Sequence, residues 1–343
     1  MGAHAASVAS PGGPPARAPF VIARSRRVRN RLWWALCALG LVILVVPVVW
    51  ILYGVFDRGV IGWRWSVLWT PTQGVAGGLS NDIVGTLLIT FGVGVMATIV
   101  GVGCGVYLSE FMRPGMRRSV LRGAYEVLSG IPSIVFGYVG YVALDVGLHW
   151  QFSLLAALIV LSLLVVPYIA KATETSLNQV PTAYREGGEA LGMAKSYQLR
   201  KIVVRAALPG MLTGLVVAIA ISVGETAPLL YTAGASEYYP TGALVHSPVP
   251  YLTQVVYADF DSSFPQQHVL ANDAAMLLVL LVVAILLGSR LIVRATQKYA
   301  PNRAFAANKT DVRRSFRRRS SQSTEALFEG SGPHEPAAEK LDQ

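Results

Sequence analysis

The chain has 343 residues, of which 53% are hydrophobic and only 14% are charged, and its mean hydropathy is +0.49. This composition excludes an ordinary soluble protein, because several apolar runs exceed the length that crosses a bilayer. The net charge of +10 does not indicate binding of nucleic acid, because the basic residues flank the apolar runs. Cys37 and Cys104 lie within apolar runs, so they predict neither a metal site nor a disulfide framework.

The N-terminal part combines a polar arm with an apolar run. Residues 1–31 are rich in Ala and Pro and end in a basic cluster, a composition that predicts a disordered arm. No apolar core followed by a cleavage site is present, so no signal peptide is expected. The first predicted span covers residues 32–56 and carries Trp or Tyr at both ends, and an exposed loop is expected at residues 57–81.

Two glycine-containing spans follow. The second span is predicted at residues 83–108, where Gly101 and Gly105 form a small-xxx-small face for close helix contact. A short basic loop is expected at residues 109–122. The third span, at residues 124–144, contains Gly130-Ile-Pro-Ser-Ile-Val-Phe-Gly137, and the proline within it predicts a kink at a packed or cavity-lining site.

The second half of the chain alternates polar and apolar segments. The predicted segments are a fourth span interrupted by Pro167, a polar elbow, a fifth span, a long aromatic loop, a sixth span and a basic disordered tail, at residues 152–170, 171–206, 207–231, 232–272, 273–293 and 298–343. The aromatic loop contains no Lys or Arg, so it suits either docking of a binding protein or a lid over the path. We therefore expect one six-span region at residues 32–297.

The distribution of charge fixes the expected topology. Of the 29 Lys and Arg residues, only Arg58 and Arg64 fall on one side of the predicted spans. Basic residues concentrate on the cytoplasmic side of membrane proteins. The sequence therefore predicts an all-α integral membrane protein with six transmembrane helices, with both termini and the elbow in the cytoplasm.

The elbow carries the first family resemblance. Its segment Glu186-Gly-Gly-Glu-Ala-Leu-Gly192 is similar to the "EAA" loop of ABC importer permeases, with glycines in place of two alanines. The alternative is an ordinary solvated loop. The resemblance implies a cytoplasmic coupling loop that docks on an ATPase, with these candidate residues: Glu186, Gly187, Gly188, Glu189, Ala190 and Gly192. No phosphate-binding Gly-x-x-x-x-Gly-Lys-Ser/Thr loop is present, so we expect no enzyme activity and no cofactor, and hydrolysis in a separate subunit.

Three further strings resemble permeases of the phosphate-specific (Pst) transporter family over roughly residues 30–300. They are Tyr107-Leu-Ser-Glu110, Gly130 to Gly137, and Gly224-Glu-Thr-Ala-Pro-Leu-Leu230, and the last is similar to the A-type subunit. The resemblance implies a type I ABC importer permease (MetI-like) fold in the bacterial plasma (inner) membrane. It also implies four kinds of partner: a C-type permease, two cytoplasmic ATPase subunits, an extracytoplasmic phosphate-binding protein and phosphate.

A carboxylate in the fifth span is the main candidate for the translocation path. Glu225, next to Thr226, falls about 18 residues into this span, roughly 27 Å from the cytoplasmic end at 1.5 Å per residue. Charged residues within spans usually serve function. We hypothesise that Glu225 accepts the O–H of phosphate and rejects the fully ionised analogue. A structural ion pair or a helix-capping role before Pro228 is the alternative.

The path also requires a cation or amide donors. The Pst family often has Arg one turn before this Gly-Glu, where this chain has Ile221, and Lys171 matches a position at which the family commonly has Arg. The alternative for Lys171 is an anchor at the membrane interface. Pro132 and Ser133 are further path candidates. Glu126 and Glu174 are expected to be solvated or interfacial, and Glu110 to cap the second span.

The sequence therefore predicts a permease subunit of an ATP-driven phosphate importer. Three alternatives remain open: a permease for another oxyanion such as molybdate or sulfate, a channel or scaffold that needs no ATPase, and an integral-membrane enzyme. The last is the least favoured, because no nucleophile or metal-ligand constellation lies near a span end.

Overall fold

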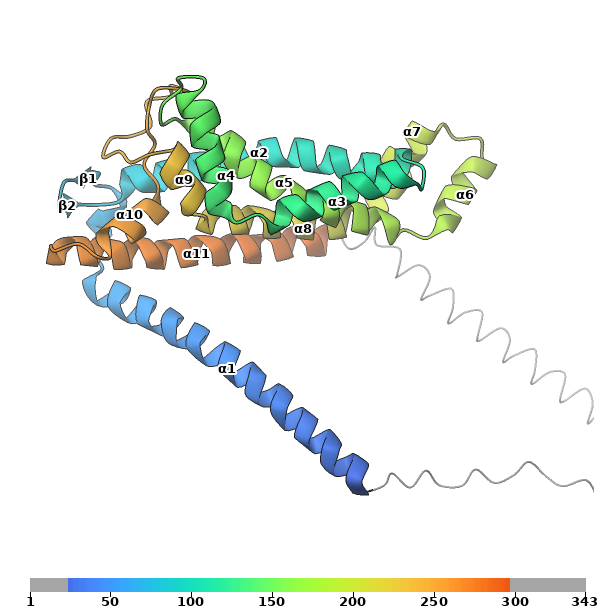
Figure 1. Cartoon of the computed structure of the whole chain (residues 1–343), viewed down its shortest axis with the longest axis horizontal. Coiled ribbons are helices and arrows are strands. Elements are labelled where there is room, and N and C mark those ends of the chain that lie inside the picture. Colours follow the sequence, from blue (N-terminus) through green and yellow to red (C-terminus); the bar gives the residue numbers. More distant parts are fainter. Residues whose placement is uncertain (1–23, 297–343) are drawn as a thin grey trace, which may run out of the picture. The chain divides into compact units, whose positions relative to one another are not determined.

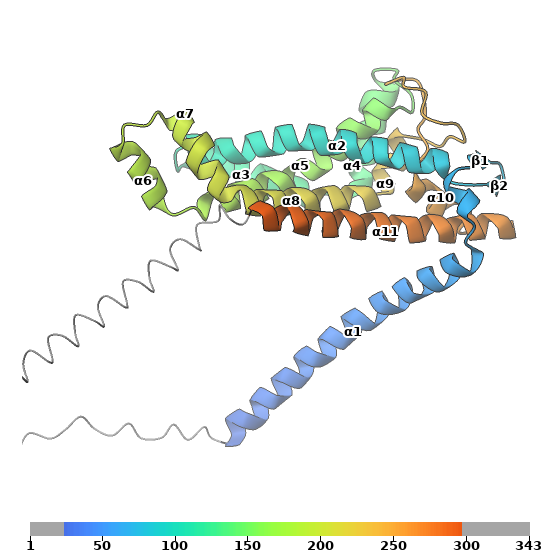
Figure 2. The ribbon, with the colours of Figure 1, turned by 180° about the vertical axis from the view of Figure 1, so that it is seen from behind.

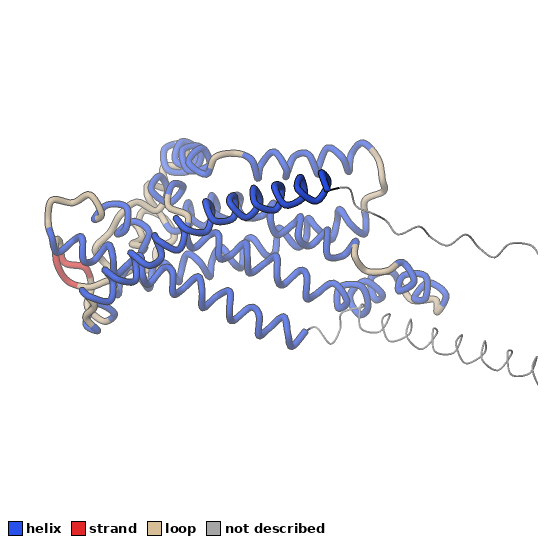
Figure 3. Tube along the Cα trace, turned by 90° about the horizontal axis from the view of Figure 1, so that it is seen from below, coloured by secondary structure: helices blue, strands red, loops and turns tan. Residues whose placement is uncertain are grey.

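The computed structural model describes residues 24–296, which are mostly helical (Figure 3). Residues 1–23 of the predicted arm and the predicted disordered tail at residues 298–343 lie outside the described part. The chain forms two units, residues 1–57 and 58–343. The elements in chain order are α1 (Arg24–Gly62), the 3-10 turn η1 (Trp65–Leu68), β1 (Thr72–Gln73), β2 (Ala76–Gly77), α2 (Ser80–Val106), the π-helical η2 (Tyr107–Phe111), α3 (Met116–Gly130), α4 (Ser133–Gly140), the π-helical η3 (Tyr141–Val146), α5 (Leu154–Asn178), α6 (Thr182–Ala190), α7 (Lys195–Gln198), the π-helical η4 (Leu199–Val203), α8 (Val204–Gly224), α9 (Ala227–Thr232), α10 (Leu252–Asp259) and α11 (Pro265–Thr296).

Five helical segments are long and apolar enough to cross a membrane, and the count rises to six when a bent helix pair is taken as one broken span. The five are Val28–Gly62, Ser80–Phe111, Leu154–Asn178, Lys195–Gly224 and Pro265–Thr296. The bent pair joins α3 to α4 and η3. This agrees with the predicted six-span, all-α architecture. One boundary differs: α1 begins at Arg24, so residues 24–31 are helical rather than part of a disordered arm.

The predicted kink in the third span is confirmed, and it is a sharp bend. The helix axis turns by 95° between Gly130 and Ser133. Ile131 has an extended backbone (φ −72°, ψ 132°), because a following proline disfavours the α conformation. The predicted basic loop at residues 109–122 is largely wrong: η2 continues to Phe111, and α3 already begins at Met116.

Close packing of α2 against α5 forms the centre of the second unit. A side chain at Gly101 would meet Ile169 at 2.7 Å, and one at Gly105 would meet Thr173 at 2.6 Å. The predicted small-residue face of α2 is therefore confirmed as a helix contact. Helix α5 remains continuous through Pro167, which contradicts the predicted interruption, and most of this span is buried within the fold.

Helices α2, α5, α8 and α11 run lengthwise beside one another (Figures 1 and 2). Helices α6 and α7 lie at one end of this group, and α10 and the β1–β2 hairpin lie at the other. The predicted elbow at residues 171–206 is shorter than expected, because α5 extends to Asn178 and a helical span resumes at Lys195. The predicted loop at residues 232–272 contains α10 and the start of α11.

Candidate functional site

The predicted fifth span breaks at the candidate carboxylate. Helix α8 ends at Gly224, Glu225 has an extended backbone (ψ 125°), and α9 begins at Ala227 with Pro228 in its first turn. Proline is tolerated in a first turn because the amide hydrogen that it lacks has no helical partner there. The expectation of one continuous helix over residues 207–231 is therefore wrong, since the chain uses Pro228 to restart a helix.

The breaks before α4 and α9 lie at the same end of a packed helix pair. A side chain at Gly137 would meet the Pro228 Cα at 2.7 Å, and one at Gly140 would meet Thr232 at 3.2 Å. The Tyr138 and Tyr231 rings also make an edge-on contact, 6.2 Å between centroids. Contact positions rise together along both helices, so α4 and α9 run parallel. The two breaks, here called the break pair, therefore bring four of the five predicted path residues to the same end of α4 and α9: Pro132, Ser133, Glu225 and Thr226.

The Glu225 side chain is half-buried, and no cation or hydrogen-bond donor binds its carboxylate within residues 24–296. Its backbone oxygen accepts a hydrogen bond from Thr253 Oγ1 at 3.3 Å. Thr226, not Glu225, occupies the N-cap position of α9, and its side chain makes no capping bond. Among the described residues, therefore, neither the ion pair nor the cap that were the alternatives for this carboxylate is found.

A small cavity lies beside the break pair, and sequence reasoning missed it. Besides three apolar side chains its lining is rich in hydroxyls, which belong to Thr86, Thr90, Ser222, Tyr251 and Thr253. Thr86 and Thr90 are four residues apart, a spacing that places them on one face of α2 and that could have indicated a polar face in an apolar span. The other hydroxyls come from distant segments, so no local pattern announces them.

Lys171 lies away from the break pair. It sits on α5 with an exposed side chain, beside Ala172, which packs against Gly214 of α8. Glu225 lies about 16 Å beyond Gly214 along α8 at 1.5 Å per residue. The structure therefore does not bring Lys171 to Glu225.

The predicted coupling residues gather on α6 and the turn that follows it. Glu186, Gly187, Glu189, Ala190 and Gly192 are exposed, and Gly192 has a positive φ of 67° that ends the helix. Gly188 is buried beneath Gln198, whose side chain a Cβ at this position would meet. One glycine thus permits close approach of α7, and the rest of the motif faces outward.

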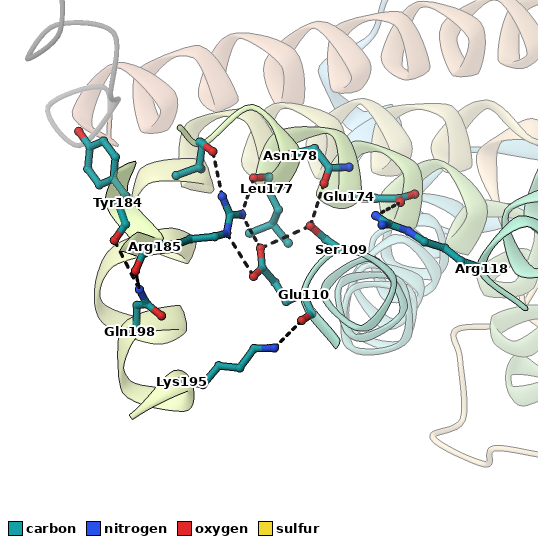
Figure 4. Close-up of polar contacts among 11 residues, drawn as sticks. Ser109, Glu110, Arg118, Glu174, Leu177, Asn178, Tyr184, Arg185, Lys195 and Gln198 are labelled. Carbon is teal, nitrogen blue, oxygen red and sulfur yellow. Dashed lines mark hydrogen bonds and ion pairs between the residues drawn. The ribbon is translucent and has the colours of Figure 1, made fainter. Parts of the chain in front are cut away.

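Glu174 is not solvated or interfacial, as its sequence position suggested, but buried in an ion-pair cluster, of which Figure 4 shows the contact with Arg118. Its Oε1 binds Arg118 Nη2 at 3.2 Å and Arg122 Nε at 2.8 Å, and its Oε2 accepts from the Tyr125 hydroxyl at 2.6 Å. These three partners have i, i+4, i+7 spacing on α3, which is the one sequence signal of a shared polar face. The cluster holds α3 against α5.

Comparison with known proteins identifies the family. Residues 97–302 match the sequence profile of the family described as "binding-protein-dependent transport system inner membrane component". The chain belongs to this permease family. The matched residues include α3 to α11, and thus both the break pair and the coupling residues.

The curated relatives of this permease are transporter subunits. It is 50% identical over 279 residues to the phosphate transport system permease protein PstA 2 of Mycobacterium bovis, which covers 81% of this chain and 91% of that protein. It is 31% identical to PstA of Yersinia pestis, over 78% of this chain and 90% of the relative. The probable PstA of Methanocaldococcus jannaschii is 30% identical, over 76% and 92% respectively.

A solved relative supports the fold. An inward-facing MetNI methionine ABC transporter chain superposes with a TM-score of 0.54 at 25% identity, covering 64% of this chain and 95% of that one. The MetI-like permease fold, the A-type Pst resemblance and the multi-pass inner-membrane location are thus confirmed. Such permeases work with a partner permease, a separate ATPase and a substrate-binding protein, so the chain is a transporter subunit and not an enzyme.

Proposed function

We propose that this permease is the A-type half of an ATP-driven importer of inorganic phosphate. It pairs with a C-type permease and works with two ATPase subunits and an extracytoplasmic phosphate-binding protein. The observation that carries this proposal is the 50% identity to a phosphate transport permease over 81% of the chain.

The break pair is the proposed part of the translocation path. Helices that stop and restart within a membrane are tolerated where they line a cavity, and transporters place substrate sites there. The carboxylate of Glu225, which has no partner within residues 24–296, can accept the O–H of a protonated phosphate, and sulfate at neutral pH has no such proton to donate. Thr226 and Ser133 add hydroxyls that can donate to phosphate oxygens.

Lys171 has a different proposed role in the path. Its exposed ammonium group lies toward the end of α5 that carries Glu174, far from Glu225. We assign it to the cytoplasmic exit, where a cation can attract the departing anion. The cation that accompanies phosphate at the break pair then comes from the partner permease.

The outward face of α6 is the proposed docking surface for the ATPase. Glu186, Gly187, Glu189, Ala190 and Gly192 leave it open, and the exposed Leu191 adds an apolar contact. ATP-driven movement of this surface would open and close the permease alternately to each side of the membrane.

Reconstitution of the four kinds of subunit in proteoliposomes tests the proposal. We expect uptake of radiolabelled phosphate that requires ATP and the binding protein, and little uptake of sulfate or molybdate. Deletion of residues 184–195 should remove the ATPase from the purified complex and abolish uptake. Transport of sulfate or molybdate in preference would contradict the substrate, and ATP-independent flux would contradict the importer.

A further inference from the structure

Arg185 lies beside the exposed coupling residues, but its side chain points back into the permease (Figure 4). Its Nη2 lies 2.6 Å from Glu110 Oε1 and its Nε lies 3.4 Å from Glu110 Oε2. The same guanidinium donates to the backbone oxygens of Leu177 at 3.0 Å and Val180 at 2.9 Å. One side chain of α6 therefore binds the end of the α2 span and the end of α5 together. Glu110 is thus an ion-pair partner of α6 rather than only a cap.

Glu110 is also bound by a residue that follows the turn between α6 and α7. Lys195, the first residue of α7, donates from Nζ to the Glu110 backbone oxygen at 2.8 Å and lies 5.1 Å from the centre of the Phe111 ring. Residues 182–198, here called the coupling segment, therefore bind the end of the α2 span at two places, through Arg185 of α6 and Lys195 of α7. Charge-assisted hydrogen bonds are shorter and about twice as strong as neutral ones, so these contacts resist displacement of the segment relative to the span.

The coupling segment is itself a stiff unit. Gln198 is buried and donates from Nε2 to the backbone oxygen of Arg185, while its side chain fills the space that Gly188 leaves open. This contact ties α7 to α6 at the residue that binds Glu110. A displacement applied to α6, which contains Arg185, therefore also reaches α7 and Lys195 without being absorbed by the turn.

The two helices that Arg185 binds are closely packed against each other. Gly101 and Gly105 of α2 contact Ile169 and Thr173 of α5 so closely that no side chain fits between them. Ser109 adds a hydrogen bond to Asn178 Oδ1 at 3.2 Å at the cytoplasmic end of both spans. A force on Glu110 is therefore applied to the α2–α5 pair as a whole.

We propose that the Arg185–Glu110 ion pair is the mechanical link that carries ATPase-driven movement of the coupling segment into the α2–α5 pair. This inference rests on the proposed importer function and names two positioning residues within it. Glu110 has a side chain only 9% exposed and Arg185 one 25% exposed, so water competes weakly for the pair.

The test measures phosphate imported per ATP hydrolysed by the reconstituted complex. Arg185→Gln and Glu110→Gln each remove the ion pair while keeping a polar side chain. We expect each to lower the ratio by about tenfold, the effect of losing roughly one charge-assisted hydrogen bond, with the ATPase still bound. The double variant should lose no more than either single variant, because both changes remove one interaction. Arg200→Gln, an exposed arginine of η4 with the same change of charge, is the matched control and should keep the wild-type ratio.

Three results would overturn the link. The first is a wild-type ratio in both single variants, and the second is losses that add in the double variant. The third is loss of the ATPase from the purified single variants, which would make the pair part of docking rather than transmission. Failure of the proposed substrate is separate: a wild-type complex that imports sulfate or molybdate instead refutes the substrate, and the ratio is then measured with that ion.

Discussion

At the cytoplasmic end of the permease the carboxylates of Glu110 and Glu174 both bind arginine, whereas at the break pair the carboxylate of Glu225 binds no cation within residues 24–296. The cytoplasmic pairs join separate helices: α6 to the α2 span, and α3 to α5. The helices that follow the breaks, α4 and α9, instead meet through a glycine against a proline backbone and through two tyrosine rings. Ion pairs thus join the helices at the cytoplasmic end, whereas within residues 24–296 the carboxylate at the other end is left available and no ion pair joins α4 to α9.

The largest effect is expected from removal of the Glu174 carboxylate, which binds α3 to α5. Glu174→Ala leaves Arg118 and Arg122 without their counter-ion in a partly buried site, which costs on the order of 3 kcal/mol. We expect a clear fall in the thermal unfolding temperature of the complex in detergent. Glu126→Ala, on the exposed face of α3, is the control and should leave that temperature unchanged. Equal behaviour of the two variants would show that the Glu174 cluster does not hold α3.

The close packing of α2 against α5 can be tested by substituting two glycines of α2. Gly105→Ala forces a Cβ to within 2.7 Å of the Ala170 backbone oxygen, and such overpacking costs about 2 kcal/mol. Gly103→Ala meets open space, so improved helix propensity should leave stability unchanged or slightly raised. The thermal unfolding temperature should therefore fall in Gly105→Ala and stay unchanged or rise slightly in Gly103→Ala. Similar losses at both positions would refute the close α2–α5 contact.

The free carboxylate is tested by Glu225→Gln. We expect phosphate uptake to fall by about tenfold, equivalent to about 1.4 kcal/mol, because an amide is a weaker acceptor for the phosphate O–H. Discrimination against sulfate should weaken at the same time, since the amide can donate to either ion. Glu126→Gln makes the same chemical change at an exposed site and should transport normally. Unchanged uptake and unchanged discrimination in Glu225→Gln would end the proton-acceptor hypothesis.

The smallest expected effect concerns the turn between α6 and α7. Gly188→Ala must displace Gln198, a flexible side chain, so we expect a loss of less than about 1 kcal/mol of stability and a modest fall in transport. Gly187→Ala has open space around its Cβ and should fold as the wild type does. A larger effect at Gly187 on binding of the ATPase, measured by co-purification, would support its place on the docking surface.

Sequence reasoning reached the spans, the kink and the glycine contact because each depends on neighbouring residues. Hydropathy predicted the crossings, Pro132 predicted the kink, and the spacing of Gly101 and Gly105 predicted a close helix contact. The break at Glu225 was missed because Pro228 is compatible with the start of a new helix as well as with a kink.

The ion pairs could not be predicted in the same way. Arg185 and Glu110 are 75 residues apart, and Arg122 and Glu174 are 52 apart, so only the packed fold decides that they meet. The sequence marked Glu174 as a charge near a span end, where solvation is the usual outcome. Burial followed because α3 lies along α5 instead of leaving the fold as a loop.

The 95° bend before α4 has a consequence for how the protein is made. Helix α3 has 15 residues and α4 with η3 ends at Val146, so each limb is about 22 Å long at 1.5 Å per residue, shorter than a bilayer core of about 30 Å. Neither limb can cross alone, and the polar backbone at the corner cannot face lipid. Helix α9, which packs against α4 at Gly137 and Gly140, leaves the ribosome much later. We therefore expect the packing of this bent segment to be completed only after synthesis of the fifth span, not in the order in which the chain emerges.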